Sequence, residues 1–126
     1  MTRLVLDAGA LVAYERRDRT VAARLEVARR HGLRLRTTAV VLAQVWRDDP
    51  RQALLAQLLK AVEVVAVDEE LGRRTGGLLA RSGTADPVAA TVVLVAEPGD
   101  SILTSDPRDI RHLVDTTRTN VRVVAC

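Results

Sequence analysis

A single carboxylate follows a short apolar run near the start of the chain. Asp7 comes directly after residues 4–6, and the small and apolar residues 8–13 that follow it can begin a helix. In an open α/β sheet, an acid between a strand and a helix lies at the carboxyl edge of the strand, beside the positive end of the helix, where ligands usually bind. If other acids reach the same edge, Asp7 can help to hold a metal ion.

Other acids occur where helices are expected to begin. Asp86 and Asp106 each precede a proline, as an N-cap followed by Pro at the first helical position would, and Asp109 lies three residues beyond Asp106. Capping alone, worth about 1 kcal/mol, would explain Asp86 and Asp106. It would also explain Asp68, which follows a strand as Asp7 does and to which we assign no chemistry. Capping does not explain why acids recur near one edge, because like charges repel unless a cation neutralises them.

The residue types that could act as ligands indicate which metal ion could bind. Oxygen ligands without His or Cys favour Mg²⁺ or Mn²⁺ over zinc, and His31 and His112 are isolated enough to be read as surface residues. A divalent pair held by carboxylates can activate water and stabilise the leaving oxygen of a phosphodiester. The sequence contains no GxSxG motif or glycine-rich phosphate loop, and Cys126 is its only cysteine. Metal-dependent phosphodiester hydrolysis is therefore the chemistry that these residues favour.

The elements that would position the acids alternate along the chain. Apolar or β-branched runs predict strands, and apolar residues at helical spacing predict helices between them. The predicted strands are residues 4–6, 33–36, 62–67, 101–104 and 121–124, and the predicted helices lie at 8–13, 21–30, 38–48, 50–60, 69–81, 87–96 and 107–114. In the third helix, Trp46 is expected in the core and Arg47 in solvent.

The segment 88–96 allows two interpretations because it is apolar almost throughout. It could be a buried helix, or one arm of a hairpin that turns at residues 97–100. We favour the helix, because Asp86 and Pro87 are correctly placed as its cap and first residue.

This alternation predicts one α/β domain over residues 1–126. We expect a parallel sheet of about five strands between helical layers, the three-layer sandwich of a Rossmann-like fold. Helices in such folds run antiparallel to the strands, so helix N-termini and strand C-termini share an edge. Asp7, Asp86 and Asp106 would then lie along one rim.

Composition narrows the range of functions. Phe is absent and Trp46 and Tyr14 are the only aromatic residues, which argues against a base-stacking platform for single strands. The single cysteine excludes an internal disulfide framework and a Cys-rich zinc site. No signal sequence or membrane span is evident, so we expect a soluble, cytoplasmic protein. The net charge is +3, and the arginines of residues 16–30 either bind phosphate or form a solvated helix face.

Four segments together resemble the PIN domain of VapC-like toxins. They are LVLDAGAL at residues 4–11, TAVVLAQVWR at 38–47, GTAD at 83–86 and LTSDPRDI at 103–110, and their order extends over the whole chain. The resemblance implies a PIN-like fold, often dimeric, with an Mg²⁺- or Mn²⁺-dependent ribonuclease site. It also implies an RNA substrate and a neutralising protein antitoxin as partners, and a homodimer.

The resemblance assigns roles to particular residues. The first acid of the family falls on Asp7 and the late acid on Asp106, with Asp109 one turn further as another candidate ligand. Two positions depart from the family pattern, because Gln44 stands where the middle helix normally has Glu and Ala89 stands where a second acid follows Asp86. Gln44 can still bind a metal-held water, and Asp86 can serve as the replacement ligand.

Two other functions compete with a metal-dependent endoribonuclease of this class. A catalytically silent PIN-like module would bind RNA or an antitoxin-like protein without cutting, as Gln44 and Ala89 suggest. A phosphoacceptor domain also has an acid after its first strand, but it needs a second acid beside Asp7 and a late lysine, and the only lysine is Lys60. Thr104 and Ser105 could hold a phosphate or the attacking water, or cap the helix that follows.

Overall fold

The protein contains a fully parallel β-sheet. A computed structural model describes residues 2–126, and in this part of the chain five strands pair in the order β3-β2-β1-β4-β5. The strands are β1 (Arg3–Leu6), β2 (Arg34–Thr38), β3 (Val62–Val65), β4 (Ser101–Thr104) and β5 (Arg122–Ala125). The first and fourth strands in the chain are therefore neighbours at the centre, with Leu6 paired to Leu103. This confirms the predicted α/β architecture.

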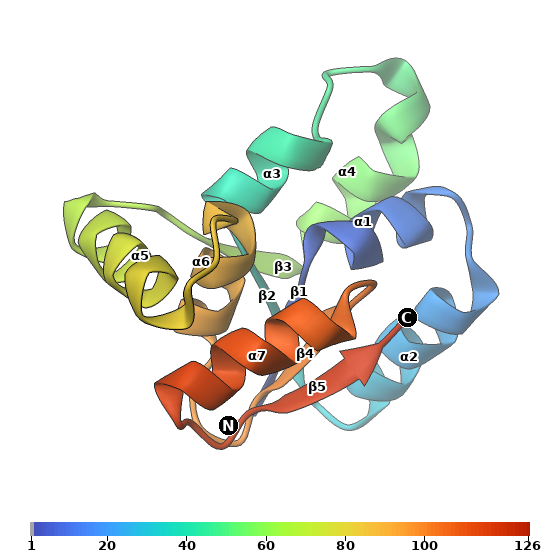
Figure 1. Ribbon diagram of the computed structural model, residues 1–126. Coiled ribbons are helices and arrows are strands. Elements are labelled where there is room, and N and C mark those ends of the chain that lie inside the picture. Colours follow the sequence, from blue (N-terminus) through green and yellow to red (C-terminus); the bar gives the residue numbers. More distant parts are fainter. Residues whose placement is uncertain (1) are drawn as a thin grey trace.

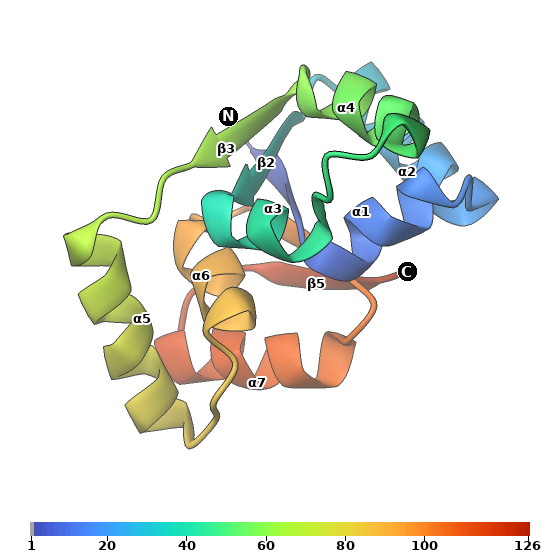
Figure 2. The same ribbon diagram turned by 90° about the horizontal axis from the view of Figure 1, so that it is seen from above.

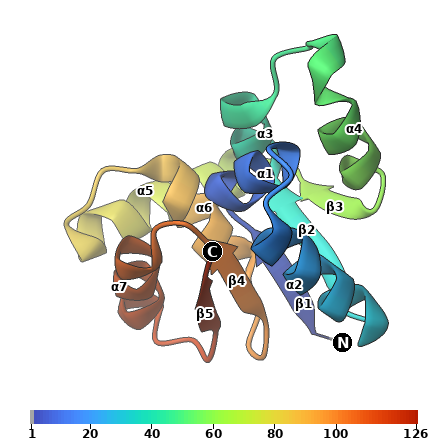
Figure 3. The same cartoon turned by 90° about the vertical axis from the view of Figure 1, so that its right-hand side faces the viewer.

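Helices cover both faces of the sheet. They are α1 (Ala8–Glu15), α2 (Arg19–Arg30), α3 (Ala39–Val45), α4 (Ala53–Leu59), α5 (Glu69–Ser82), α6 (Pro87–Val95) and α7 (Pro107–Thr117), with a 3-10 turn η1 (Pro50–Gln52) before α4. In Figures 1 and 2, α1, α2 and α4 lie on one side of the sheet and α6 and α7 on the other. Figure 3 shows α5 as an outer helix packed against α6 and α7. The three-layer arrangement follows from right-handed crossovers between parallel strands.

Helix α6 is the most deeply buried helix of the second layer. Residues 89–93 and Val95 are all buried. A helix that is apolar on every side must lie inside the protein, and here it packs between the sheet and α5. Asp86 caps α6 by accepting hydrogen bonds from the N–H groups of Val88 (3.0 Å) and Ala89 (3.2 Å). The helix interpretation of residues 88–96 is correct, and the hairpin alternative is wrong.

The third helix ends earlier than the sequence suggests. We expected it to continue to about residue 48, but α3 stops at Val45 and Trp46 is 36% exposed rather than in the core. The buried Gln52 side chain hydrogen-bonds to the backbone at this end of α3. It accepts from Arg47 N–H (2.9 Å) and donates to Val45 C=O (2.9 Å). These bonds satisfy polar groups that another helical turn would have satisfied, so the chain can leave the helix. Arg47 is exposed, as predicted.

Strand boundaries differ by a few residues from the prediction. The second strand extends to Thr38, which also caps α3 by accepting from Val41 N–H (3.3 Å). The third strand stops at Val65, and Val67 beyond it is 39% exposed. In the described part of the chain no single helix is long and apolar enough to cross a membrane. Helices α5 and α6 pass that test only when taken together, and they are bent by 109° where they meet.

The first helix approaches the loop after β4 very closely. A Cβ added to Gly9 would lie 2.6 Å from Ser105 Cβ and still closer to Ser105 Oγ, well inside van der Waals contact. Gly9 is in the first turn of α1, and Ser105 lies between Thr104 and Asp106. A residue without a side chain at position 9 therefore lets the segments that carry Asp7 and Asp106 come together.

We predict that Gly9→Ala lowers the free energy of unfolding by about 1–3 kcal/mol, because the added methyl group forces Ser105 away from α1. Gly72→Ala is the matched control, since a Cβ there has nothing within 4 Å in the exposed face of α5, and it should raise the free energy by about 0.5–1 kcal/mol. Urea unfolding of both variants measures the difference. Equal effects at the two positions would show that the contact with Ser105 is unimportant.

Candidate functional site

Asp7 lies at the point where β1 ends and α1 begins. Its N–H donates to Leu103 C=O of β4 (3.0 Å), which continues the pairing of the two central strands by one residue. The residue is 9% exposed, and its carboxylate Oδ1 accepts from Ala8 N–H (2.8 Å). The structure therefore places this acid at the carboxyl edge of the sheet, as the sequence predicts, and holds it in one orientation.

Thr104 connects Asp7 to the loop after β4. Its buried hydroxyl donates to Asp7 Oδ2 (2.7 Å) and accepts from the backbone N–H of Asp106 (2.9 Å). One role that the sequence allows for this hydroxyl is to cap the following helix, and the bond from Asp106 N–H agrees with that role. The bond to Asp7 was not predicted, because nothing in the sequence shows which strands become neighbours.

Asp106 does not cap its own helix. It occupies the N-cap position of α7 with Pro107 at the first helical position, yet its side chain accepts no capping hydrogen bond. Capping alone therefore does not explain this acid. The Asp106 side chain is exposed, so a ligand can reach its carboxylate oxygens.

Asp109 forms a pair with Asp106. The pKa of the Asp109 carboxyl is raised, first because it shares a hydrogen bond with the Asp106 carboxyl and then because of the negative charge of Asp106. The charge of Asp86 raises it further, while Arg108 acts in the opposite direction. Two like charges held close together repel, which raises the pKa of a carboxyl group, and a cation bound between them would remove that repulsion.

Asp86 lies near this pair but is engaged in capping. Its Oδ1 accepts the two N–H bonds at the start of α6 described above, and its charge reaches Asp109. Asp68 caps α5 in the same manner, accepting from Leu71 N–H (2.9 Å), as expected for an acid with a structural role. Geometry thus gives Asp86 a confirmed capping role, and its role as a replacement ligand remains a prediction.

The two positions that depart from the family pattern have different environments. Gln44 is exposed on α3, whereas Ala89 is 7% exposed in the first turn of α6. Neither brings a negative charge to the acidic edge. The two histidines contact backbone carbonyls away from the acids, since His31 Nδ1 lies 2.8 Å from Val27 C=O within α2 and His112 Nε2 lies 2.8 Å from Ser82 C=O at the end of α5.

The acids form a chain of contacts rather than a closed cage. Asp7 is joined to Asp106 through Thr104, and Asp106 is paired with Asp109. Within residues 2–126, no three His, Cys, Asp or Glu side chains are already placed around one point as a metal site would require. The donor set is nevertheless all oxygen, which suits Mg²⁺ or Mn²⁺, and Mg²⁺ usually keeps several waters when bound through one or two carboxylates. The residues present fit such a hydrated ion.

Solved structures of two other proteins have the same fold over almost the whole chain. A chain of VapBC2 from Rickettsia felis, bound to a DNA fragment from their promoter, matches with a TM-score of 0.71 at 13% identity, covering 99% of each chain. DNA-bound VapBC from Salmonella typhimurium matches with a TM-score of 0.69 at 16% identity, covering 99% of this chain and 98% of the other. These matches show that the predicted PIN-like fold class is correct.

Comparison by sequence gives no further information. No family model matches the chain, and no curated protein matches it. At the identities found, the likeness to the two solved structures concerns the fold.

We predict that Thr104→Val lowers the free energy of unfolding by about 2 kcal/mol, because it leaves Asp7 Oδ2 and the Asp106 N–H without their partner in a buried place. Thr104→Ser keeps the hydroxyl and is the control, and it should recover most of this loss. Urea unfolding measures both variants. If Val and Ser at this position are equally stable, the hydroxyl does not join the two segments.

We predict that NMR titration of the Asp109 carboxyl carbon gives a pKa above that of an ordinary aspartate, and that Asp106→Asn lowers it. The raised pKa means that the native state binds this proton more tightly than the unfolded chain does. Stability from Asp109 is therefore present at low pH and is lost as pH rises through its folded pKa. Asp115→Asn, which changes another exposed acid of α7, should leave the Asp109 titration unchanged. An ordinary Asp109 pKa in the unaltered protein would contradict the pairing.

Proposed function

We propose that this protein is a metal-dependent endoribonuclease of the PIN/VapC-like toxin class, with Mg²⁺ or Mn²⁺ as its cofactor and RNA as its substrate. The observation that carries the proposal is the joining of Asp7 to the Asp106 segment through Thr104, at the carboxyl edge of the two central strands. The full-length likeness to chains of VapBC complexes supports the same class. The Asp106–Asp109 pair supplies a reason for a cation to bind there.

The proposed site combines acids that bind the metal ion with a residue that positions them. Asp7, Asp106 and Asp109 would hold the divalent ion, with Asp86 reaching it directly or through a water molecule. When bound, the ion would lower the pKa of a coordinated water and stabilise negative charge on the phosphodiester. Thr104 keeps Asp7 and the start of α7 at a fixed separation, so it acts as a positioning residue. Gln44 contributes at most a carbonyl oxygen for a metal-held water.

The chain's own charges also favour RNA near this edge. Arg108 lies two residues after Asp106 and is exposed. At the connection from α1 to α2, Arg16, Arg17 and Arg19 have no ion-pair partners among residues 2–126. Guanidinium groups bind phosphate oxygens in a bidentate manner. Asp18, which caps α2 at the end of the α1–α2 connection, lies near this edge, because its charge and that of Asp7 both act on Cys126.

We predict that the protein cleaves members of a labelled RNA panel when Mg²⁺ or Mn²⁺ is present and that EDTA abolishes cleavage. Asp7→Asn should reduce the rate by about 100-fold or more, since it removes charge from the proposed metal ligand without changing the size of the side chain. Asp68→Asn is the matched control, because Asp68 caps α5 outside the site. Equal activity in the Asp7 and Asp68 variants would remove Asp7 from the mechanism.

A metal titration gives a second readout that does not depend on cleavage. Addition of Mg²⁺ should shift the carboxyl NMR signals of Asp7, Asp106 and Asp109 while leaving Asp68 unchanged. A protein that cleaves RNA without these shifts would contradict the proposed ligands and leave the fold class unaffected.

A second candidate function is a catalytically silent PIN-like module that binds RNA or an antitoxin-like protein. It is favoured by Gln44 and Ala89, neither of which is an acid, and by the open arrangement of the remaining carboxylates. On this account the unaltered protein should bind Mn²⁺ weakly in calorimetry, and Gln44→Glu combined with Ala89→Asp should create tight binding. Strong Mn²⁺ binding by the unaltered protein would exclude the silent module.

The partner proteins follow from the same proposal. We infer an antitoxin-like protein because the matched solved structures are VapBC complexes. An apolar groove of about 380 Å³ between α3 and α4, lined by Ala39, Leu42, Ala43, Trp46 and Leu59, offers a surface for such a partner. We also propose a homodimer, which sedimentation of the purified protein would show.

A further inference from the structure

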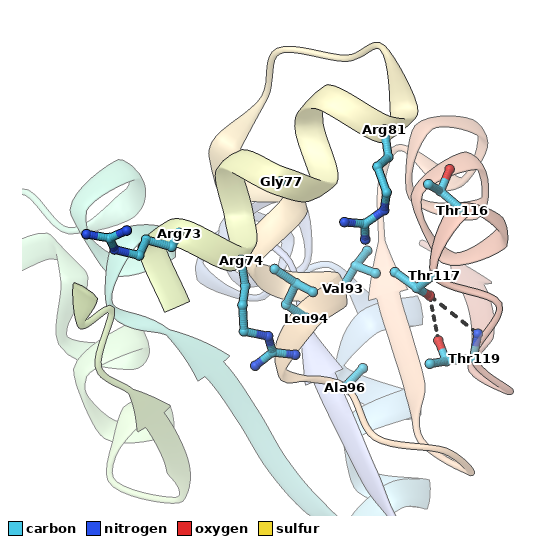
Figure 4. A pocket seen from close by; sticks show the side chains of 10 residues that line it. All are labelled: Arg73, Arg74, Gly77, Arg81, Val93, Leu94, Ala96, Thr116, Thr117 and Thr119. Atoms are coloured by element: carbon cyan, nitrogen blue, oxygen red, sulfur yellow. Dashed lines mark hydrogen bonds between the residues drawn. The ribbon is translucent and has the colours of Figure 1, made fainter. Parts of the chain in front are cut away.

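A groove of about 650 Å³ lies between α5, α6 and α7, on the layer that carries α6 and α7 (Figure 4). Arginines of α5 form one wall, and threonines at and just beyond the end of α7 form the opposite wall. The floor is apolar and comes from the last residues of α6. The residues that line it are Arg73, Arg74, Gly77, Arg81, Val93, Leu94, Ala96, Thr116, Thr117 and Thr119. No acid is among them, and none of the acids of the candidate site takes part.

The arginine wall carries positive charge that is only partly offset, because Arg74 also borders a neighbouring pocket lined by Glu63, Asp68, Glu70 and Glu97, while no acid lines the groove itself. Arg73 pairs with Glu69 (2.8 Å) and points away from the threonines in Figure 4. Arg74 and Arg81 have no ion-pair partner in the part of the chain that the structure describes. Figure 4 shows the Arg81 side chain reaching down toward Val93 and Thr117. Two free guanidinium groups on one wall favour an anion with several oxygens, such as a phosphate.

The threonine wall has the opposite hydrogen-bonding character, because its hydroxyl protons are already used within the protein. Thr116 donates to His112 C=O (2.9 Å) and Thr117 donates to Val114 C=O (2.7 Å). Thr119 must then be the donor in its 2.7 Å contact with Thr117. The Thr116 and Thr119 hydroxyl oxygens therefore keep lone pairs that can accept further hydrogen bonds, and the negative end of the α7 dipole lies on the same side. This wall suits a ligand group that donates hydrogen bonds.

A ligand that fits must combine three chemical features. It needs a phosphate for α5, hydrogen-bond donors for α7, and an apolar surface to contact Val93, Leu94 and Ala96. A ribonucleotide has all three, since its sugar hydroxyls donate and its base and sugar have apolar faces. The volume is within the range of about 300–1,000 Å³ that is usual for small-molecule sites.

We propose that this groove binds a ribonucleotide, with the phosphate on Arg74 and Arg81 and the sugar hydroxyls on Thr116 and Thr119. The ribonucleotide is either free or one unit of an RNA strand. The groove lies at the ends of α6 and α7 where these helices finish, whereas Asp86 and Asp106 lie where they begin. Binding here therefore does not depend on the metal-dependent cleavage proposed above.

The test measures binding of a short fluorescein-labelled RNA by anisotropy in EDTA, so that no divalent ion occupies the acidic site and cleavage cannot occur. Arg74→Gln combined with Arg81→Gln should weaken binding by about tenfold or more. It should also reduce the slope of log affinity against log salt by about 0.7, the contribution of the one phosphate contact that the two arginines share.

The matched control removes two positive charges elsewhere. Arg30→Gln combined with Lys60→Gln changes exposed residues outside the groove and should leave the affinity nearly unchanged. An equal loss in the control and in the groove variant would show non-specific attraction and overturn the proposal. Unchanged affinity and salt slope in the groove variant would overturn it as well.

Competition with AMP distinguishes the two sources of the ribonucleotide. If AMP displaces the labelled RNA from the unaltered protein but has no effect on the groove variant's residual binding, the groove takes a free nucleotide. If only the oligonucleotide binds, the groove takes one unit of a strand. A DNA of the same sequence lacks the 2′-hydroxyl and should bind more weakly, and equal affinity for DNA and RNA would contradict the role of the threonines.

Discussion

The Thr104 hydroxyl is the interaction on which the arrangement of the acidic edge depends. It donates to the Asp7 carboxylate and accepts from the Asp106 N–H, so one buried group joins the end of β1 to the turn after β4. These segments are 97 residues apart in the chain. The central pairing of β1 with β4 brings them together, and the close approach of Gly9 to Ser105 allows the hydroxyl to reach both partners.

Local chemistry in the sequence was sufficient to predict most of the fold. The Asp-Pro pairs at 86–87 and 106–107 mark the starts of α6 and α7, and the buried α6 could be distinguished from a strand by its cap. The parallel sheet then followed from the alternation of strands and helices. The end of α3 could not be predicted, because it depends on Gln52, whose side chain reaches the backbone of Val45 and Arg47 only after the chain has turned back.

The candidate site was predictable in position but not in detail. In a parallel sheet, residues that follow the strands lie at the same edge whatever their side-chain rotamers. The order and spacing of the predicted strands were therefore sufficient to place Asp7 and Asp106 at one edge. Whether an acid caps its helix depends on side-chain rotamers, and here Asp86 caps while Asp106 does not. The role of Thr104 could not be predicted, because the sequence does not show which strand lies beside β1. The resemblance to VapC-like PIN domains identified the same acids, and the solved structures support the shared fold.

The only cysteine of the sequence lies beside the acidic edge and is a natural attachment point for a spectroscopic probe. The Cys126 N–H donates to Thr104 C=O (2.9 Å), and partial burial together with the charges of Asp18 and Asp7 raises the pKa of its thiol. Few thiolates form at neutral pH, so maleimide dyes or spin labels should attach slowly there and faster in mildly alkaline buffer. A label at this position would report on events at Asp7 without the introduction of a new residue.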